Sequence, residues 1–521
     1  MKVFRRYSIL WWLVAACVAV ACSNEWENHY DAEGIQPKEN LLDLINVDSD
    51  ISVFASILKM TGMDSLLSAD QSYTVWAPVN EALEGVEFAD SGAMVRFVKN
   101  HVSRYSNPTS VSPATKIYML NGKPMNYSID GAFNGVQLIE GNIRANNGLL
   151  HKLSEELPYK YNILEYIGTY QEYSKVYEFV SRFVEEVYNA ELSTTYDSVF
   201  VSYNRLLADK EYGIGTIDSE DSVYTMIVPN NEAWEYSYNR IRPYFRPYAK
   251  DVSVADSIQE VQTSLAILSG LTFRGRIDGS SLPDSVVTVT GNVIRGVKDY
   301  FKDYMPIEAS NGMMYLAQGV MNLADTSVWN HTITVEAENM DYRINLPGTN
   351  SYIRTTDINS LVSGVSENSY LEVSSGNVDG GVVFDIPNTL SGKYDVYVDF
   401  VAPLIDGVAL ADEVTKVVFQ LKYLGENGRQ TTKNNNTATI VGGASNSGVI
   451  SVLAYSGVEL PVSDYYDSMW FLEEGNIPGN IAETTTLQVK TKVNNSDAKK
   501  GYLRKFRVDK VRFVPIVEQV E

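Results

Sequence analysis

The chain has 521 residues, a formal net charge of −23 and only two cysteines, Cys17 and Cys22. A surface this acidic repels nucleic acid and anionic membranes, so neither is an expected partner. Beyond residue 22 the chain has no cysteine, so we expect several domains stabilised by apolar cores without disulfides.

The first 21 residues are typical of a cleaved export signal. Lys2, Arg5 and Arg6 form a short positive region, and a mostly apolar stretch follows at residues 8–21. This stretch is too short to span a bilayer comfortably, and it has no stop-transfer flank. Residues 1–21 are therefore predicted to be a signal peptide.

Residues 19–23, Ala-Val-Ala-Cys-Ser, resemble the lipobox of bacterial lipoproteins. The resemblance implies that Cys22 carries lipid and becomes the mature N-terminus, with the lipid as the only membrane attachment. Cys17 follows a similar pattern, but Cys22 leaves a full apolar region upstream and a polar tail after it. An ordinary cleavage site beside an incidental cysteine is the remaining alternative.

Residues 22–37 are polar and lack periodicity, so we expect a tether between the lipid and the first domain. Glu25 and Glu27 resemble the export signal of surface-exposed Bacteroidetes lipoproteins, and Ser23 is compatible with outer-membrane delivery. These features predict an outer-membrane lipoprotein that faces the cell exterior.

The segment 38–158 alternates between helical and strand patterns. Apolar residues recur at helical spacing between residues 51 and 58, and Gly62 follows where a C-terminal cap is expected. Residues 73–83 then predict a buried strand stopped by proline, after which Asn80 is placed to cap a helix.

Residues 73–83 resemble the first signature of fasciclin (FAS1) domains, a strand that ends in Ala-Pro-x-Asn. The family's later segments follow in order at 97–102, 120–123 and 142–151. The resemblance implies an α+β fasciclin domain over 38–158. Asn100-His101 replaces the Tyr-His pair that animal fasciclin proteins often use in integrin adhesion, so that activity is not inferred.

A second, diverged copy of the pattern is predicted over 159–326. Residues 224–234 repeat the strand–proline–asparagine motif, and 309–315 repeat the closing signature, with Tyr315 where the first copy has histidine. Apolar residues and tyrosines between 163 and 184 lie on one helical face, and an insertion lengthens the copy. The repeat period is therefore a whole domain.

From residue 330 to 521 the pattern changes to short strands separated by turns. Residues 393–400 alternate cleanly between apolar and polar, which is typical of a sandwich strand. Segments 335–340 and 506–515 resemble the first and last strands of galactose-binding-like domains, including family 6 carbohydrate-binding modules. The predicted fold class is thus multidomain, with two α+β fasciclin domains followed by an all-β jelly-roll sandwich.

The predicted ligand-binding site lies between two strands of this sandwich. Its residues are Tyr465, Tyr466, Asp467, Trp470 and Phe471. The rings offer faces for stacking on a sugar, and Asp467 offers hydrogen-bond acceptors. The alternative is that one tyrosine and Trp470 or Phe471 are ordinary core residues of a strand.

Metal and catalytic motifs are scarce. Glu336 and Glu338 leave two interpretations open, a calcium site as in some relatives of these modules or a plain pair at a strand end. The sequence contains no zinc-protease helix motif, nucleophile elbow or phosphate-binding loop. We therefore predict a protein that is not an enzyme and holds no metal or cofactor, with a paired-carboxylate glycosidase as the remaining enzymatic alternative.

These features predict a non-catalytic accessory subunit on the cell surface. It captures a glycan or peptide and docks to an outer-membrane importer channel of the TonB-dependent type and to the channel's lid lipoprotein. The alternative function is an adhesin that binds host or matrix components through its fasciclin domains.

Overall fold

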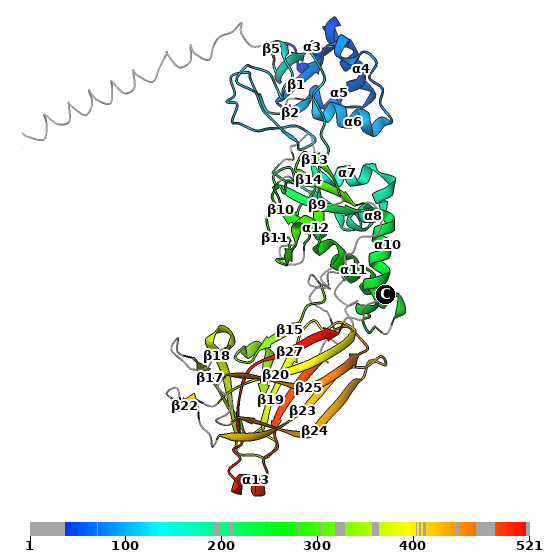
Figure 1. Cartoon of the computed structure of the whole chain (residues 1–521). Helices are drawn as coiled ribbons and strands as arrows, with labels where there is room; N and C mark the ends of the chain where they lie inside the picture. Colours follow the sequence, from blue (N-terminus) through cyan, green and yellow to red (C-terminus); the bar gives the residue numbers. More distant parts are fainter. Residues whose placement is uncertain are drawn as a thin grey trace, which may run out of the picture. The chain divides into compact units, whose positions relative to one another are not determined.

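The structure is a computed structural model of the chain (Figure 1). It describes residues 37–516 except for 70, 192, 194–197, 209–212, 250, 280, 302–303, 318–328, 357–363, 403, 406–407, 410–412, 443–447 and 465–484. The chain divides into two compact units, Met1–Tyr161 with Tyr188–Val199, and Asn162–Val187 with Phe200–Glu521.

The first unit contains a four-stranded sheet with the order β2-β1-β6-β5. Its central strands β1 and β6 are parallel, and the outer pairs are antiparallel. The elements are α3 (Leu41–Val47), η1 (Ser49–Ile51), α4 (Ser52–Met60), α5 (Asp64–Leu67), β1 (Tyr73–Pro78), η2 (Asn80–Leu83), α6 (Ser91–Asn100), β2 (Val102–Arg104), β3 (Ile117–Tyr118), β4 (Pro124–Met125), β5 (Leu138–Ala145) and β6 (Gly148–Leu153).

Local sequence sets the helix ends of the first unit. Asn40 caps α3 in a capping box with Asp43, and Asp90 accepts a hydrogen bond from the N–H of Ala93 at the start of α6. After α4, Gly62 has a φ of 71°, which confirms the predicted C-terminal cap. The apolar faces of these helices pack on β1, which is buried along its whole length.

The second unit begins with a similar succession of helices and strands, to which β7, β8 and α12 are added. Its sheet has the order β10-β9-β14-β13, again with parallel central strands. Tyr224 pairs with Gly312 as Tyr73 pairs with Gly148 in the first unit. The elements are α7 (Ile163–Thr169), η3 (Gln171–Tyr173), α8 (Ser174–Ser181), β7 (Val184–Tyr188), β8 (Phe200–Asn204), α9 (Arg205–Ala208), β9 (Tyr224–Pro229), α10 (Asn231–Ile241), η4 (Arg242–Tyr244), α11 (Val252–Ser269), β10 (Thr272–Arg274), β11 (Ser285–Val287), β12 (Val293–Arg295), α12 (Val297–Phe301), β13 (Met305–Ala309) and β14 (Gly312–Ala317).

The buried side chain of Asn147 ties the helices of the first unit to its sheet. Its Oδ1 accepts a hydrogen bond from the N–H of Leu41, the first residue of α3, at 2.8 Å. Its amide nitrogen donates to the carbonyl oxygens of Leu67 and Ala69, both at 2.8 Å. One side chain thus satisfies backbone groups that the ends of two helices leave open.

Asn311 makes the same contacts in the second unit. It accepts a hydrogen bond from the N–H of Ile163, the first residue of α7, at 3.0 Å. Its amide nitrogen donates to the carbonyl oxygens of Ile217 and Ser219 at 2.7 and 3.0 Å. The two sheets therefore share a hydrogen-bonding scheme as well as a strand order.

Glycine follows this asparagine in both units for a steric reason. Gly148 and Gly312 have φ values of 153° and 154°, a conformation that favours glycine. A β-carbon at either position would collide with the carbonyl oxygen of the tyrosine opposite, Tyr73 or Tyr224. The glycine of the closing signature is thus required by the parallel pairing of the two central strands.

The prediction that Asn80 caps the following helix is wrong. Its side chain instead holds the start of α4, accepting a hydrogen bond from the N–H of Val53 at 2.9 Å and donating to the carbonyl oxygen of Ser49 at 2.8 Å. Asn231 accepts in the same way from the N–H of Lys175 at 3.1 Å. The contact joins segments far apart in the sequence, so local spacing does not reveal it.

Residues 163–184 also differ from the single helical face that their spacing predicts. The first helix ends at Thr169, a 3₁₀ turn follows, the next helix begins at Ser174, and Val184 begins a strand. The new helix starts where Asn231 binds the backbone. A tertiary contact therefore overrides the local periodicity.

Among the described residues, the remainder of the second unit forms two large antiparallel sheets and the short pair β21-β22. One has the order β17-β18-β27-β20-β25, with β15 also paired to β27, and the other has the order β16-β19-β26-β23-β24. The elements are β15 (Ile333–Glu336), η5 (Met340–Tyr342), β16 (Arg343–Asn345), β17 (Thr349–Thr355), η6 (Ser366–Asn368), β18 (Ser369–Ser375), β19 (Gly381–Ile386), β20 (Gly392–Val401), β21 (Leu404–Ile405), β22 (Val408–Ala409), β23 (Val414–Leu424), β24 (Gln430–Gly442), β25 (Val449–Leu460), β26 (Thr485–Thr491), α13 (Asn495–Lys499) and β27 (Lys505–Ile516).

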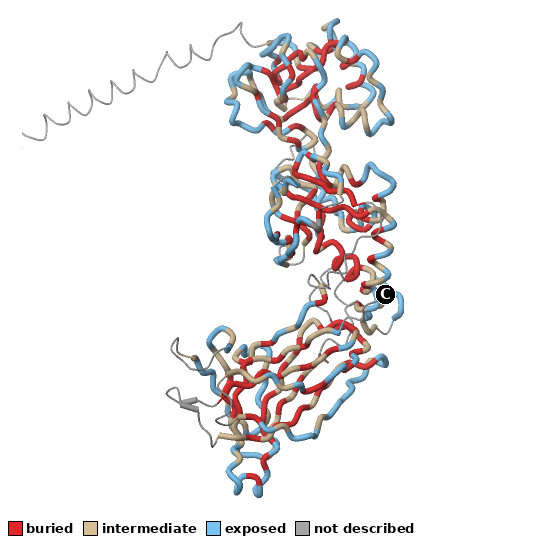
Figure 2. The backbone as a smooth tube through the Cα atoms, viewed as in Figure 1, coloured by how far each residue is buried: buried red, intermediate tan, exposed pale blue. Residues whose placement is uncertain are grey.

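A single apolar core lies between these two sheets. We call the two sheets and their core the sandwich. Tyr394, Val396, Val398 and Phe400 are buried on the inner face of β20, as the alternation predicted. They belong to one cluster with Phe384 from the other sheet. Figure 2 shows buried positions along the strands of both sheets.

His151 and Tyr315 occupy equivalent positions in the first two sheets. Nε2 of His151 lies 3.2 Å from the carbonyl oxygen of Asn107, and the hydroxyl of Tyr315 donates to the carbonyl oxygen of Ile277 at 2.9 Å. His151 is buried, and its ring stacks on that of Trp76. Burial lowers the pKa of His151 to about 4, so the ring is neutral at pH 7.

We expect His151→Gln to reduce the acid sensitivity of the first unit. A histidine with a lowered pKa contributes stability that is complete above its ordinary value of 6.5 and is lost as the pH falls toward about 4. The loss is at most about 3 kcal/mol. Urea unfolding of the full chain at pH 7 and pH 4.5 measures the free energy of unfolding of both proteins. Carboxylates titrate equally in both, so an unchanged pH dependence in the variant would contradict this assignment.

Candidate functional site

The residues predicted to bind ligand lie outside the part of the chain that the structure describes. Tyr465, Tyr466, Asp467, Trp470 and Phe471 all fall within 465–484, and Cys22 falls before residue 37. Their roles stay predictions. Among the described helices, none combines the length and apolar character needed to cross a bilayer.

The two residues that flank the segment 465–484 are joined by a hydrogen bond. Asp464 is buried and accepts from the N–H of Thr485 at 2.8 Å. It also accepts from the N–H and the hydroxyl of Thr389, at 2.9 and 2.6 Å. Burial raises the pKa of Asp464, and these hydrogen bonds oppose the rise. The segment therefore leaves and rejoins the sandwich at one fixed point.

A row of amide side chains crosses the outward face of the sheet β16-β19-β26-β23-β24. Gln420 pairs with Gln488 on one side and with Asn434 on the other. Its amide nitrogen donates to Oδ1 of Asn434 at 2.7 Å. The next residues of the same strands, Leu421 and Leu487, are buried in the core. Because side chains alternate along a strand, the amides face outward.

A neighbouring row on this face carries opposite charges. Asp385 and Lys422 each pair with Thr486, one on either side of β26. Burial raises the pKa of Asp385. Within the described residues, the half-buried side chains of Asp385, Lys422 and Gln488 make no hydrogen bond or ion pair. A ligand can therefore bind these groups without first breaking a contact within the protein.

The outward face of the other sheet offers fewer available groups. Glu372 binds Arg354 and Arg507, each at 3.0 Å, and Asp399 binds Arg512 at 2.7 Å. A ligand on this face would have to replace charge pairs that are already satisfied. We therefore assign the candidate site to the face with the amide row.

One local signal for the amide row is present in the sequence. Residues 485–491 of β26 alternate between buried and half-buried positions, as a strand with one outward polar face should. Alternation marks which residues point outward. It does not show which strands become neighbours, so Gln420 and Gln488 were not recognised as a pair.

A separate acidic group lies around the start of the sandwich. Asp509 is buried, and its Oδ1 accepts from the N–H and the hydroxyl of Ser366 at 2.9 and 3.0 Å. The hydroxyl of Ser366 also donates to Glu336 at 2.5 Å. Both carboxylate oxygens of Glu338 are enclosed and accept no hydrogen bond from the residues that the structure describes. Burial, together with repulsion from Glu336 and Asp509, raises the pKa of Glu338.

This group has the ligand chemistry of a calcium site but not its geometry. Calcium takes six to eight oxygen ligands, and carboxylates are suitable donors. In the described part of the chain, no three acidic, histidine or cysteine side chains are placed together to hold a metal ion. The enclosed carboxylate of Glu338 is instead a group whose protonation is favoured by folding.

We expect Glu338→Gln to raise the thermal unfolding midpoint at pH 7. A carboxylic acid whose pKa is raised by folding contributes stability at a pH below its ordinary pKa. This stability is lost as the pH rises through the pKa of the folded state. Glutamine keeps the shape without the charge, so the gain over wild type should vanish near pH 4. Differential scanning calorimetry in EDTA at both pH values measures the difference.

The experiment has two controls, a matched variant and the addition of calcium. Glu459→Gln, at an exposed position of β25, should leave the midpoint unchanged under every condition. Stabilisation of the wild type by calcium, together with a loss of stability in Glu338→Gln, would contradict the assignment and show that the group holds a cation.

The comparisons with known proteins identify one domain. Residues 49–157 match the family model of the fasciclin domain. No curated protein matches the chain. A solved FAS1 domain pair from the insect cell adhesion molecule fasciclin I is 14% identical with a TM-score of 0.20, over 54% of this chain and 98% of that chain. A xylan-binding domain from CBM 22 is 9% identical with a TM-score of 0.22, over 37% and 97%. An exo-beta-1,3-galactanase from Phanerochaete chrysosporium is 14% identical with a TM-score of 0.18, over 35% and 29%.

At TM-scores of 0.18–0.22, these solved structures assign neither a fold to the sandwich nor a function to the chain. The domain identity comes from the match over 49–157. Residues 49–157 of this β-rich, multidomain chain form a fasciclin domain.

Proposed function

We propose that this protein is a non-catalytic, lipid-anchored binding protein of the outer-membrane surface. Two fasciclin-type domains and a jelly-roll sandwich make up its folded part. The observation that carries the proposal is the set of half-buried, unengaged polar side chains on one sheet face. The fasciclin match and the repeated Asn-Gly core support the domain arrangement, and the lipobox at Cys22 supports the anchor.

The ligand proposed for this sheet face is a glycan, with a peptide as the second candidate. Sugar hydroxyls both donate and accept hydrogen bonds. Asp385 offers acceptors, Lys422 offers donors, and the amides of Gln420 and Gln488 offer both. Neighbouring strands lie about 4.8 Å apart, so one extended ligand can contact several of these groups. The aromatic residues of the predicted site would add stacking faces.

The fasciclin-type domains are proposed to dock the protein to a TonB-dependent importer channel and its lid lipoprotein. A lipid anchor keeps the protein in the same membrane as the channel and raises its effective concentration there. Capture by the sandwich then takes place beside the route of uptake. The alternative function is adhesion to host or matrix components.

We expect Gln420→Ala combined with Gln488→Ala to weaken glycan binding about tenfold, because two hydrogen bonds worth roughly 0.5–1.5 kcal/mol each are lost. A glycan array with the full-length protein identifies the ligand, and titration calorimetry measures its affinity. Glu459→Ala is the control, because Glu459 is an exposed residue of β25, which belongs to the other sheet. An unchanged affinity in the double variant would contradict the assigned face.

Docking is tested by a pull-down of the tagged, lipidated protein from its own membranes. We expect stoichiometric recovery of an importer channel and its lid lipoprotein, identified by mass spectrometry. Cys22→Ser should abolish this recovery, because the variant cannot be lipidated. Recovery of the wild-type protein alone would contradict the docking proposal and favour the adhesin.

A further inference from the structure

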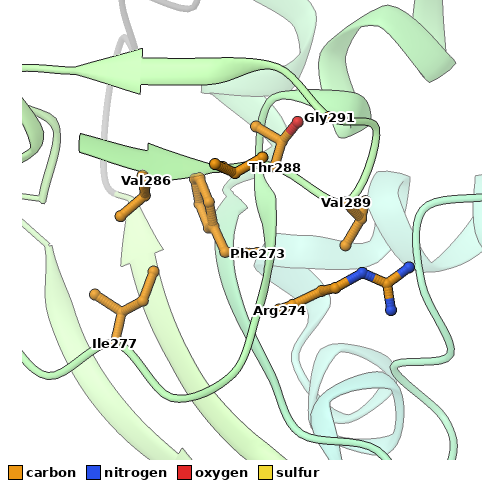
Figure 3. Close-up of a pocket in the computed structure, with 8 residues that line it drawn as sticks. Phe273, Arg274, Ile277, Val286, Thr288, Val289 and Gly291 are labelled. Atoms are coloured by element: carbon orange, nitrogen blue, oxygen red, sulfur yellow. The ribbon is translucent and has the colours of Figure 1, made fainter.

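The second unit contains a cavity of about 400 Å³ beside its first sheet. This volume falls within the range of small-molecule sites. Strand β10, strand β11 and the turn that leads to β12 surround the cavity (Figure 3). The lining residues are Phe273, Arg274, Ile277, Val286, Val287, Thr288, Val289 and Gly291.

The first unit has the same local backbone arrangement. The hairpin β3–β4 corresponds to β11–β12, because each pairs its strands antiparallel beside the edge strand of the sheet. In the first unit Ser103 bridges to Met119, and in the second unit Phe273 bridges to Thr288. Phe273 therefore occupies the place of Ser103.

A second equivalence follows from a threonine in the central strand of each sheet. The hydroxyl oxygen of Thr74 accepts from the N–H of Asn107 at 2.8 Å, and that of Thr225 accepts from the N–H of Ile277 at 2.8 Å. Ile277 therefore occupies the place of Asn107.

The two units differ in chemistry at this shared location. In the first unit, the amide nitrogen of Asn107 donates to the hydroxyl of Ser103 at 3.0 Å, so the polar pair satisfies itself. The second unit has isoleucine and phenylalanine instead, and these apolar side chains line a cavity that they do not fill. A mainly apolar cavity with a few polar groups at its edge is the usual lining of a small-molecule site.

One charged side chain lies at this cavity. Arg274 lines it and is exposed, and among the described residues it makes no ion pair or side-chain hydrogen bond. Figure 3 shows its guanidinium on the Val289 side, away from Val286 and Ile277. An arginine without a carboxylate partner is notable in a chain with 65 acidic and 42 basic residues. It provides a fork of donors suited to an anion.

We propose that this cavity binds a small amphipathic carboxylate, with the apolar body against Phe273, Ile277 and Val286 and the carboxylate on Arg274. Burial of the apolar body supplies the driving force. The charge-assisted hydrogen bond orients the ligand and favours a carboxylate over a neutral analogue. The site is separate from the sheet face of the sandwich and does not depend on the function proposed for it.

Decanoate and decanol are the probes, because they share an apolar chain and differ in the charged group. Each is titrated by calorimetry into the unlipidated full chain carrying Cys22→Ala, in detergent-free buffer. We expect saturable binding of decanoate, and weaker binding of decanol. Arg274→Gln should weaken decanoate binding roughly three- to tenfold and leave decanol unchanged, because the arginine contacts only the carboxylate.

Two further variants locate the site. Arg104→Gln removes the arginine at the equivalent register position of the first unit and should leave decanoate binding unchanged. Ile277→Asn restores the first unit's residue and should weaken both ligands, with calorimetric unfolding to verify its fold. Arg274 is exposed, so its substitution does not disturb the core. No saturable decanoate binding, or equal binding by wild type and Arg274→Gln, would overturn the proposal.

Discussion

Both helix-and-sheet domains depend on the hydrogen bonds of one buried asparagine, which directly precedes β6 in the first domain and β14 in the second. Asn147 and Asn311 each bind three backbone groups outside the sheet, and one of these groups is the N–H of the first residue of a helix. Leaving a buried group unsatisfied costs about 1–3 kcal/mol, so no aliphatic side chain can replace either residue cheaply. This amide fixes where the helices begin relative to the parallel strands, and the loops around each sheet inherit their positions from it.

Much of this framework was predictable because its signals are local. A strand ended by proline, a glycine after a helix and the alternation at 393–400 each reflect a constraint within a few residues. The errors occurred where a distant group intervenes. Asn80 binds the start of α4, and Asn231 begins a new helix at Ser174. Neither contact follows from the spacing of neighbouring residues, because each depends on how the chain folds back on itself.

The candidate sites were less predictable than the fold for the same reason. Aromatic residues next to an acidic one attract attention in a sequence, which favoured the segment containing Tyr465 and Trp470. The amide row depends on register, since Gln420 and Gln488 become neighbours only through strand pairing. The apolar character of the cavity in the second unit becomes informative only because Ile277 lies where the first unit has Asn107. Recognising such sites requires knowing which residues hold equivalent positions in the two sheets.

The hydrogen bond between Asp464 and Thr485 holds the two ends of the segment 465–484 together. The fold of the sandwich therefore does not depend on the sequence of that segment. Loop-closure entropy changes slowly with the length of a segment whose ends are held together, and here the two flanking residues are joined through the buried carboxylate of Asp464. Insertions or exchanges within 465–484 should therefore be tolerated by the scaffold. Sequence changes between these two residues can then accumulate in evolution while the folded body that carries the segment stays the same.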